Sequence, residues 1–192
     1  MLSVLVSYLY ISITTFLTGF GIRLLIKKCF GYEIKEIISL IYAGLGAVTV
    51  YAGIYSLFAG VSLGANIGLL LFCLLVVLIG KKDLCQYYEK QKTRLTKGKV
   101  LFVILMLLLF SYGASRGYMH WDSGLYHAQA IRWIEEYGVV PGLANLHCRL
   151  AYNSSAFVLT ALYSMSFLGG QSLHTVSGFM ALILAIKGLD VT

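Results

Sequence analysis

Long hydrophobic blocks alternate with short charged segments along most of the chain. A helix needs about 20 apolar residues to cross the hydrocarbon core of a bilayer. Four blocks approach or exceed that length, at residues 1–26, 37–59, 65–80 and 100–115. We therefore predict an all-α, polytopic membrane protein in which residues 1–115 form a four-helix transmembrane region.

Two further apolar segments follow a long polar stretch. Residues 156–168 are apolar but short for a crossing, Gly169 interrupts them, and an apolar run over 172–186 then ends at Lys187. We predict that the first segment is a helix lying along the membrane interface and that the second crosses. The chain thus divides into the four-helix region, an outer loop over 116–172 with interfacial helices, and a fifth transmembrane helix over 173–192.

The charges give this arrangement a direction. The chain is 59% hydrophobic and 12% charged, with a mean hydropathy of +0.82 and a net charge of +7. Residues 23–36 and 81–99 hold 11 of the 15 basic residues, whereas the outer loop holds three arginines. Cytoplasmic loops of membrane proteins carry such an excess of Lys and Arg. We therefore expect a multi-pass protein of the bacterial inner (cytoplasmic) membrane with its N-terminus outside.

The same distribution argues against nucleic acid as a partner, because the basic residues sit in the connections between apolar blocks. Tyr87 and Tyr88 lie among the basic residues of 81–99 and leave contact with lipid head groups as an alternative role for that segment. We predict that 81–99 is a cytoplasmic loop. Within the second block, Gly44 and Gly46 predict a close helix neighbour, since small residues let membrane helices approach.

The longest polar stretch, residues 118–155, carries the candidate chemistry. Asp122 followed by the sequence up to Tyr137 predicts a helix with Asp122 as its N-cap and Gly138 as its C-cap. Aromatic residues recur along this helix (Tyr126, Trp133 and Tyr137), which is typical of a helix lying at the membrane interface. Asn153 or Ser154 would cap the next helix.

Asp122 has two interpretations that are compatible. It is a helix cap, or it is a carboxylate at the mouth of a membrane cavity that takes a proton from an acceptor hydroxyl. Arg132 and Arg149 are the cations able to hold a phosphate; contact with lipid head groups is the alternative. A divalent metal site built from Asp122 and the histidines is a further alternative, but no histidine spacing supports it.

The motif W-D-S-G-L-Y-H-x4-I-R-W-I-E-E-Y-G, followed by N-L-H-x-R-L-A-Y-N-S-S, resembles the outer loop of bacterial GT-C glycosyltransferases. It is closer still to a set of uncharacterised multispanning bacterial membrane proteins with the same loop. The resemblance covers residues 118–180. It implies transfer of a sugar from a polyprenyl-phosphate donor to a glycan or lipid acceptor of the cell envelope. It also implies that Asp122 is the catalytic base and that four residues line the donor or acceptor site: Tyr126, His127, Arg149 and Asn153.

Two departures from that family stand out. An acidic pair is common near this position, whereas Asp122 has no adjacent carboxylate, so the resemblance leaves metal use open. Such enzymes also have many more spans after this loop, and we therefore expect that the chain is the N-terminal part of a longer or split protein. The alternatives to an enzyme are a non-catalytic membrane subunit of envelope polysaccharide assembly or export, and a small ion-coupled transporter. The transporter is disfavoured because the apolar blocks lack mid-membrane ionisable residues.

Overall fold

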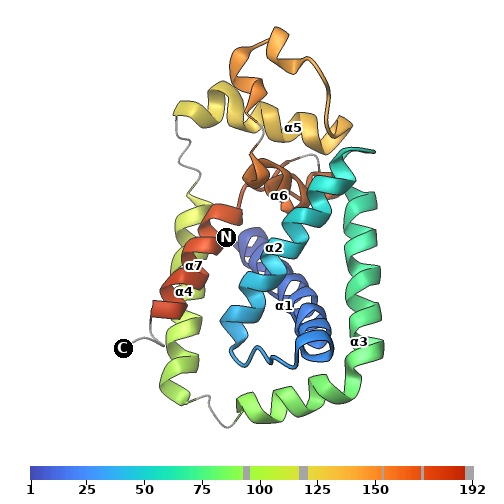
Figure 1. Ribbon diagram of the computed structural model, residues 1–192. Helices are drawn as coiled ribbons and strands as arrows, with labels where there is room; N and C mark the ends of the chain where they lie inside the picture. The colour runs from blue at the N-terminus through green and yellow to red at the C-terminus, as the bar shows by residue number, and fades with distance from the viewer. Residues whose placement is uncertain (93–95, 117–120, 153, 170, 189–192) are drawn as a thin grey trace.

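The computed structural model describes residues 1–92, 96–116, 121–152, 154–169 and 171–188, and within these ranges every regular element is a helix. The long helices are α1 (Leu2–Phe30), α2 (Ile37–Ser56), α3 (Leu63–Lys92) and α4 (Lys97–Ser115). The shorter α-helices are α5 (Ala128–Tyr137), α6 (Ser155–Tyr163) and α7 (Val176–Gly188). Figure 1 shows α1 inside the bundle and α5 across one end of it.

Among the described residues, the four helices α1 to α4 are long and apolar enough to cross a membrane. The prediction of a fifth transmembrane helix over 173–192 is wrong for the described part, because α7 has only 13 residues and is therefore about 20 Å long. Lys187 near its end lies 2.5 Å from Glu36, which precedes α2. The end of α7 thus reaches the side of the bundle that carries the basic residues, as the charge pattern indicated.

The segment predicted as the loop 81–99 is largely helical. Helix α3 continues to Lys92, and its C-terminal part turns and lies across the end of the bundle (Figure 1). Residues 81–92 include four Lys and two Gln, which favour helix, and contain no glycine or proline. We call this side of the molecule, with residues 31–36 and the end of α3, the basic end. The opposite side is the α5 end.

The bundle packs around α1, which contacts α2, α3 and α4. A Cβ at Gly44 of α2 would lie 1.7 Å from the carbonyl oxygen of Thr15, and one at Gly19 of α1 would lie 1.9 Å from that of Leu40. The two helices therefore touch backbone to backbone, which confirms the prediction for Gly44. Gly46 is exposed and has no neighbour there, so the prediction for that residue is wrong.

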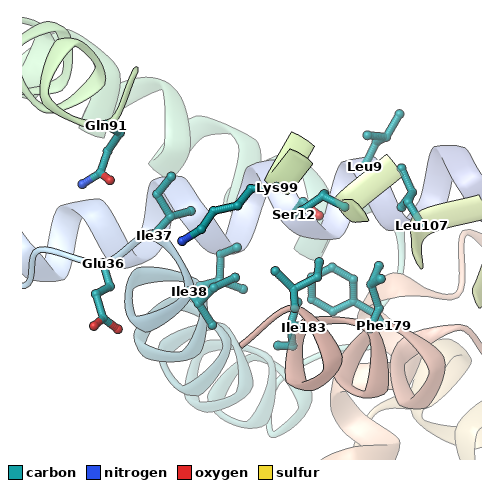
Figure 2. Close-up of a pocket in the computed structure, with 14 residues that line it drawn as sticks. Leu9, Ser12, Glu36, Ile37, Ile38, Gln91, Lys99, Leu107, Phe179 and Ile183 are labelled. Atoms are coloured by element: carbon teal, nitrogen blue, oxygen red, sulfur yellow. The ribbon is translucent and has the colours of Figure 1, made fainter. Parts of the chain in front are cut away.

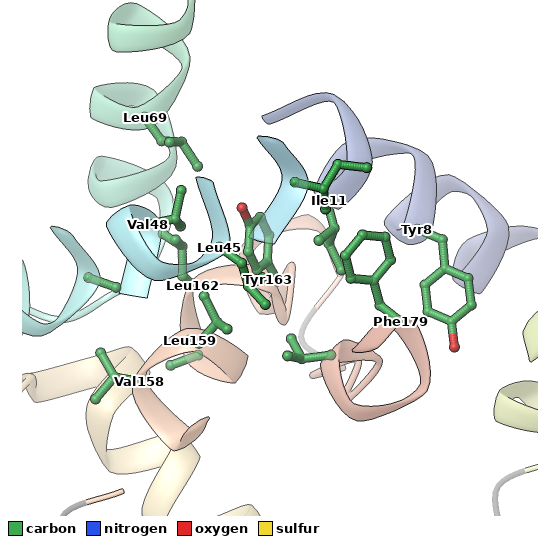
Figure 3. Close-up of a cluster of buried hydrophobic side chains, with 14 of the residues drawn as sticks. Tyr8, Ile11, Leu45, Val48, Leu69, Val158, Leu159, Leu162, Tyr163 and Phe179 are labelled. Carbon is green, nitrogen blue, oxygen red and sulfur yellow. The ribbon is translucent and has the colours of Figure 1, made fainter. Parts of the chain in front are cut away.

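Helix α6 packs into the interior of the bundle, and its predicted place along a membrane interface stays a prediction. Six consecutive residues from Val158 to Tyr163 are buried, and they join α1, α2 and α7 in one apolar cluster (Figure 3). Polar pairs tie α6 to its neighbours: the Tyr163 hydroxyl lies 2.9 Å from Thr14 Oγ1, and Asn66 Nδ2 donates to the Leu162 carbonyl at 2.9 Å. Buried polar groups need such partners.

Helix α5 is docked onto the turn between α2 and α3. The amide of Val61 donates to the Ile134 carbonyl at 2.9 Å, and the amide of Val139 donates to the Ser56 carbonyl at 2.7 Å. Gly138 ends α5 with φ of 73°, which confirms the predicted C-cap, and a Cβ there would lie 2.3 Å from the Ser56 oxygen. Backbone contacts at both ends of this turn fix the position of α5.

Candidate functional site

Asp122 does not cap a helix. Its backbone is helical (φ −65°, ψ −25°), the preceding residue Trp121 is helical too, and the carboxylate makes no capping hydrogen bond. Asp122 therefore lies within a helical segment and not at its start. A single π-helical turn, Ser123–His127, links Asp122 to α5. Such π-helical turns are rare in proteins, and those that occur are often found at functional sites.

The carboxylate of Asp122 instead faces an arginine from a distant part of the loop. Arg149 Nη1 lies 3.5 Å from Asp122 Oδ1, and its guanidinium lies 5.4 Å from the centre of the Tyr126 ring. A short 3-10 helix, Cys148–Ala151, positions Arg149, and the His147 ring accepts the Arg149 amide at 3.2 Å. A planar guanidinium on an aromatic face is a favourable cation–π arrangement.

Aromatic rings continue from this ion pair toward α6. Tyr126 contacts His127 with ring centres 4.3 Å apart and Tyr152 with centres 5.6 Å apart. His127 in turn lies 5.1 Å from Phe157 of α6. We call the six residues that meet here the outer cluster: Asp122, Tyr126, His127, Arg149, Tyr152 and Phe157.

The structure therefore brings together four of the five residues that the sequence singled out. Asp122, Tyr126, His127 and Arg149 share the outer cluster, whereas Asn153 lies outside the described residues. Ser154 caps α6, accepting the Ala156 amide at 3.3 Å, as one of the two predicted caps. The sequence did not single out Tyr152 and Phe157, because neither ring belongs to a helical repeat of aromatic residues like the one that marked Tyr126.

The Asp122–Arg149 pair is accessible. The Asp122 side chain is 36% exposed and that of Arg149 is 41% exposed. Exposed ion pairs contribute about 0–1 kcal/mol to stability. A competing anion or acceptor hydroxyl can therefore reach either group without opening the bundle.

Arg132, the other arginine that the sequence offered for binding a phosphate, is arranged differently. Arg132 pairs with Glu135 at 3.3 Å and with Glu136 at 2.6 Å, so its charge is used on its own helix and does not join the outer cluster. Glu135 is buried and accepts hydrogen bonds from the Ser172 hydroxyl at 2.7 and 2.9 Å. In the sequence, Glu135 is marked only by its four-residue spacing from the apolar Ile131, which places the two on one helix face.

His174 lies near this buried carboxylate. Burial lowers the pKa of His174 below its ordinary value, the charge of Glu135 opposes that shift, and His127 lowers the pKa further. The groups that follow α6 in the chain, Ser172 and His174, thus face back toward α5. This links the α6–α7 connection to the helix that carries the outer cluster.

No group of three or more His, Cys, Asp or Glu side chains within the described ranges is arranged to hold a metal ion. The arrangement of the outer cluster is that of one carboxylate, one guanidinium and several rings. Such a set of groups can accept a proton, hold a phosphate and stack on a planar or sugar surface.

Two of the apolar cavities beside α1 are large. One of about 650 Å³ lies toward the start of α1 and α3 and is lined by Tyr10, Asn66, Met165 and Gln171 among other residues. The other, of about 560 Å³, lies between α1, α2, α4 and α7; Glu36 and Gln91 stand at one end of it and Leu9 and Leu107 at the other (Figure 2). Both have apolar walls with a few polar groups, which suits a hydrocarbon chain.

The fold and the outer cluster define an all-helical protein with four helices long and apolar enough to cross a membrane and a polar segment docked at one end. The chain belongs to the family described as domain of unknown function (DUF8201), whose model matches residues 1–191. No curated protein and no solved structure matches the chain significantly.

Proposed function

We propose that this chain is a GT-C-type membrane glycosyltransferase, or the N-terminal part of one. It moves a sugar from a polyprenyl-phosphate donor to a glycan or lipid acceptor of the bacterial cell envelope. The observation that supports this proposal is the position of the Asp122 carboxylate 3.5 Å from the Arg149 guanidinium, beside the Tyr126 and His127 rings. A base and a phosphate-binding cation are the two groups that this reaction requires at one place.

In the proposed reaction, the acceptor hydroxyl oxygen forms a bond to the anomeric carbon of the sugar as the bond from that carbon to the phosphate oxygen breaks. Asp122 takes the hydroxyl proton, and the polyprenyl phosphate leaves with the electron pair. Arg149 holds the phosphate, since a guanidinium binds phosphate oxygens through two parallel hydrogen bonds. Tyr126 and His127 present ring faces and edges to the donor or acceptor. Asn153, next along the chain, is the remaining candidate for this site.

The cavity of about 650 Å³ is our candidate for the lipid part of the donor. Helix α6 connects it to the outer cluster: Phe157 near its start touches His127, and the Leu162 carbonyl near its end accepts from Asn66, which lines the cavity. Nine residues of helix span about 13 Å. A phosphate at Arg149 and an isoprenoid chain in this cavity are therefore compatible with a single bound donor.

The proposed orientation places the outer cluster on the outer face of the inner membrane, with the N-terminus outside. It rests on charge: the basic end carries the two lysine- and arginine-rich connections, and α5 lies at the opposite end (Figure 1). Polyprenyl-phosphate donors for envelope glycans are substrates that a site on that face can reach directly from the bilayer.

The substitution Asp122→Asn tests the proposal. It keeps the shape of the side chain and removes its ability to accept a full proton, so we expect sugar transfer to fall by roughly 10²–10⁴-fold. The assay follows transfer from polyprenyl-phosphate sugars in membranes containing the chain, alone and with any in-frame continuation. Asp83→Asn, the same chemical change at the basic end, is the matched control, because Asp83 lies 3.6 Å from Lys27 there. Unchanged transfer in Asp122→Asn would contradict the proposed role.

A non-catalytic subunit of envelope polysaccharide assembly or export is the second candidate, and α4 favours it. Helix α4 has the smallest buried share of the four long helices, 6% against 44% for α1, so its apolar side chains are open to a partner membrane subunit. Absence of transfer by both the wild-type chain and its extended form, together with copurification of a second membrane protein, would favour this role.

A further inference from the structure

At the basic end, Arg23 is buried in an unusual setting. Its side chain is 5% exposed and lies between two aromatic rings, 5.1 Å from the centre of Phe20 and 5.0 Å from that of Tyr87. Nε donates to the Ile34 carbonyl at 3.2 Å, and Nη2 pairs with Glu33. Nη1 is buried and has no hydrogen-bond acceptor among the described residues. A buried donor without an acceptor is costly, so its presence calls for an explanation.

Arg23 lines a cavity of about 260 Å³ between the end of α1, the connection to α2 and the end of α3. The side chains that matter there are the cations of Arg23, Lys35 and Lys90, the amide of Gln91, and the carboxylate of Glu33. Three cations against one carboxylate leave a net positive charge around the cavity.

The walls of this cavity are held in place by the backbone of Lys35. Its carbonyl accepts the Tyr87 hydroxyl at 3.1 Å and Gln91 Nε2 at 2.7 Å, so the end of α3 is fastened to the connection between α1 and α2. The cavity is therefore built between fixed elements and is not formed by the tips of independent lysines.

The charge of this region acts on Glu33. Burial raises the pKa of Glu33, but the neighbouring cations Arg23, Lys27 and Lys90 outweigh that effect, and the pKa lies below its ordinary value. A carboxylate held ionised by surrounding cations indicates a positive potential that a further anion would also experience.

We propose that this cavity binds a phosphate group, supplied either by the head group of an anionic phospholipid or by free phosphate. Phosphate oxygens would accept hydrogen bonds from Lys35, Lys90 and Gln91 and would give the guanidinium of Arg23 the acceptor that it lacks. An apolar cavity of about 420 Å³ adjoins this one through Tyr87 and Gln91 and is lined by Phe16, Ile37 and Leu84. That neighbour has room for an acyl chain. The site lies at the end opposite the outer cluster and is independent of the proposed transfer.

The experiment compares lipid binding to the full chain in detergent by native mass spectrometry. Phosphatidylglycerol and phosphatidylcholine with the same acyl chains are the two probes. Lys90→Gln and Lys35→Gln remove cavity cations singly, and Lys82→Gln makes the same change on α3 at an exposed residue that does not line the cavity. We expect each cavity variant to weaken binding of phosphatidylglycerol about tenfold, as for loss of a charge-assisted hydrogen bond. Lys82→Gln should leave binding of phosphatidylglycerol nearly unchanged, and none of the variants should change binding of phosphatidylcholine.

A calorimetric titration with inorganic phosphate distinguishes the two sources. Binding of inorganic phosphate that both cavity variants weaken would identify free phosphate as a ligand, and its absence beside variant-sensitive phosphatidylglycerol binding would identify the lipid head group. Equal loss of phosphatidylglycerol binding in all three lysine variants, or no loss in either cavity variant, would overturn the proposal.

Discussion

Two arginines at opposite ends of the molecule have the same kinds of partner but differ in burial. Arg23 and Arg149 each pair with a carboxylate and each lie against an aromatic ring. The Arg23 side chain is 5% exposed and its neighbours come from three segments, whereas that of Arg149 is 41% exposed and its neighbours all come from the outer loop. The same chemical group therefore fastens helices at the basic end and stays open to a ligand at the α5 end.

The difference in burial predicts what the neighbours lose when each arginine is replaced. The groups around a buried arginine lose their donor and their packing where water reaches them poorly, whereas the groups around an exposed arginine regain water. Stability should therefore depend strongly on Arg23 and weakly on Arg149, and the reverse should hold for any activity of the outer cluster.

The largest effect is expected for Arg23→Gln. This change removes the pair with Glu33, the hydrogen bond to Ile34 and both ring contacts, and we expect the free energy of unfolding to fall by about 3 kcal/mol. Denaturant unfolding in mixed micelles, followed by circular dichroism, measures it. Lys28→Gln, at an exposed residue of the same helix, should change the free energy by less than about 0.5 kcal/mol. Equal effects of the two substitutions on the free energy of unfolding would contradict the structural role of Arg23.

A smaller effect is expected for Arg149→Gln. Loss of an exposed ion pair and one exposed cation–π contact should lower the free energy of unfolding by under about 1 kcal/mol. The same unfolding measurement applies, and the transfer assay on the same sample should show loss of the proposed activity. A loss of stability as large as that of Arg23→Gln would mean that the outer cluster is a structural joint and not an open site.

The smallest effect concerns pH at the α5 end. His174 has a pKa below its ordinary value of 6.5, because of burial and of His127, with Glu135 opposing. The unfolded chain therefore takes up the proton first as the pH falls. Stability should be full above pH 6.5 and should decline as the pH drops through that value toward the lower, folded-state pKa. The side chain keeps exposed surface, which limits the size of the decline. In His174→Gln, the free energy of unfolding should depend less on pH between pH 7 and 5. The same dependence as in the wild-type chain would show that His174 does not cause it.

The sequence predicted the four long apolar helices well because length and hydrophobicity decide them. It also predicted Gly138 as a C-cap. The resemblance to a known loop predicted that Asp122, Tyr126, His127 and Arg149 belong to one site. It did not distinguish Gly44 from Gly46, because the rotation of α2 depends on where α1 packs. Both glycines lie in the same apolar block, but only Gly44 packs against the backbone of α1, whereas Gly46 has no neighbour.

A single sequence also does not show whether an apolar run is buried against protein or faces lipid. The apolar run that contains α6 predicts only that water is avoided, and its short length suggested an interface. The structure buries it against other helices, with the hydroxyl of Tyr163 satisfied by Thr14. Glu135 was missed for a related reason: its partner Ser172 lies 37 residues further along the chain. A single sequence does not reveal pairing over such a distance.

The bond between Asn66 and the carbonyl of Leu162 has a consequence for the order of synthesis, because 96 residues separate its two ends. A ribosome finishes α1, α2 and α3 well before it makes α6, so until then the Asn66 amide has only its partners from the earlier part of the described chain, the Tyr10 hydroxyl at 2.8 Å and the Ser62 carbonyl at 3.0 Å. Contacts of such long sequence separation form late. Release of the chain before residue 155 would leave the four long helices without α6, and the Asn66 amide without the Leu162 carbonyl.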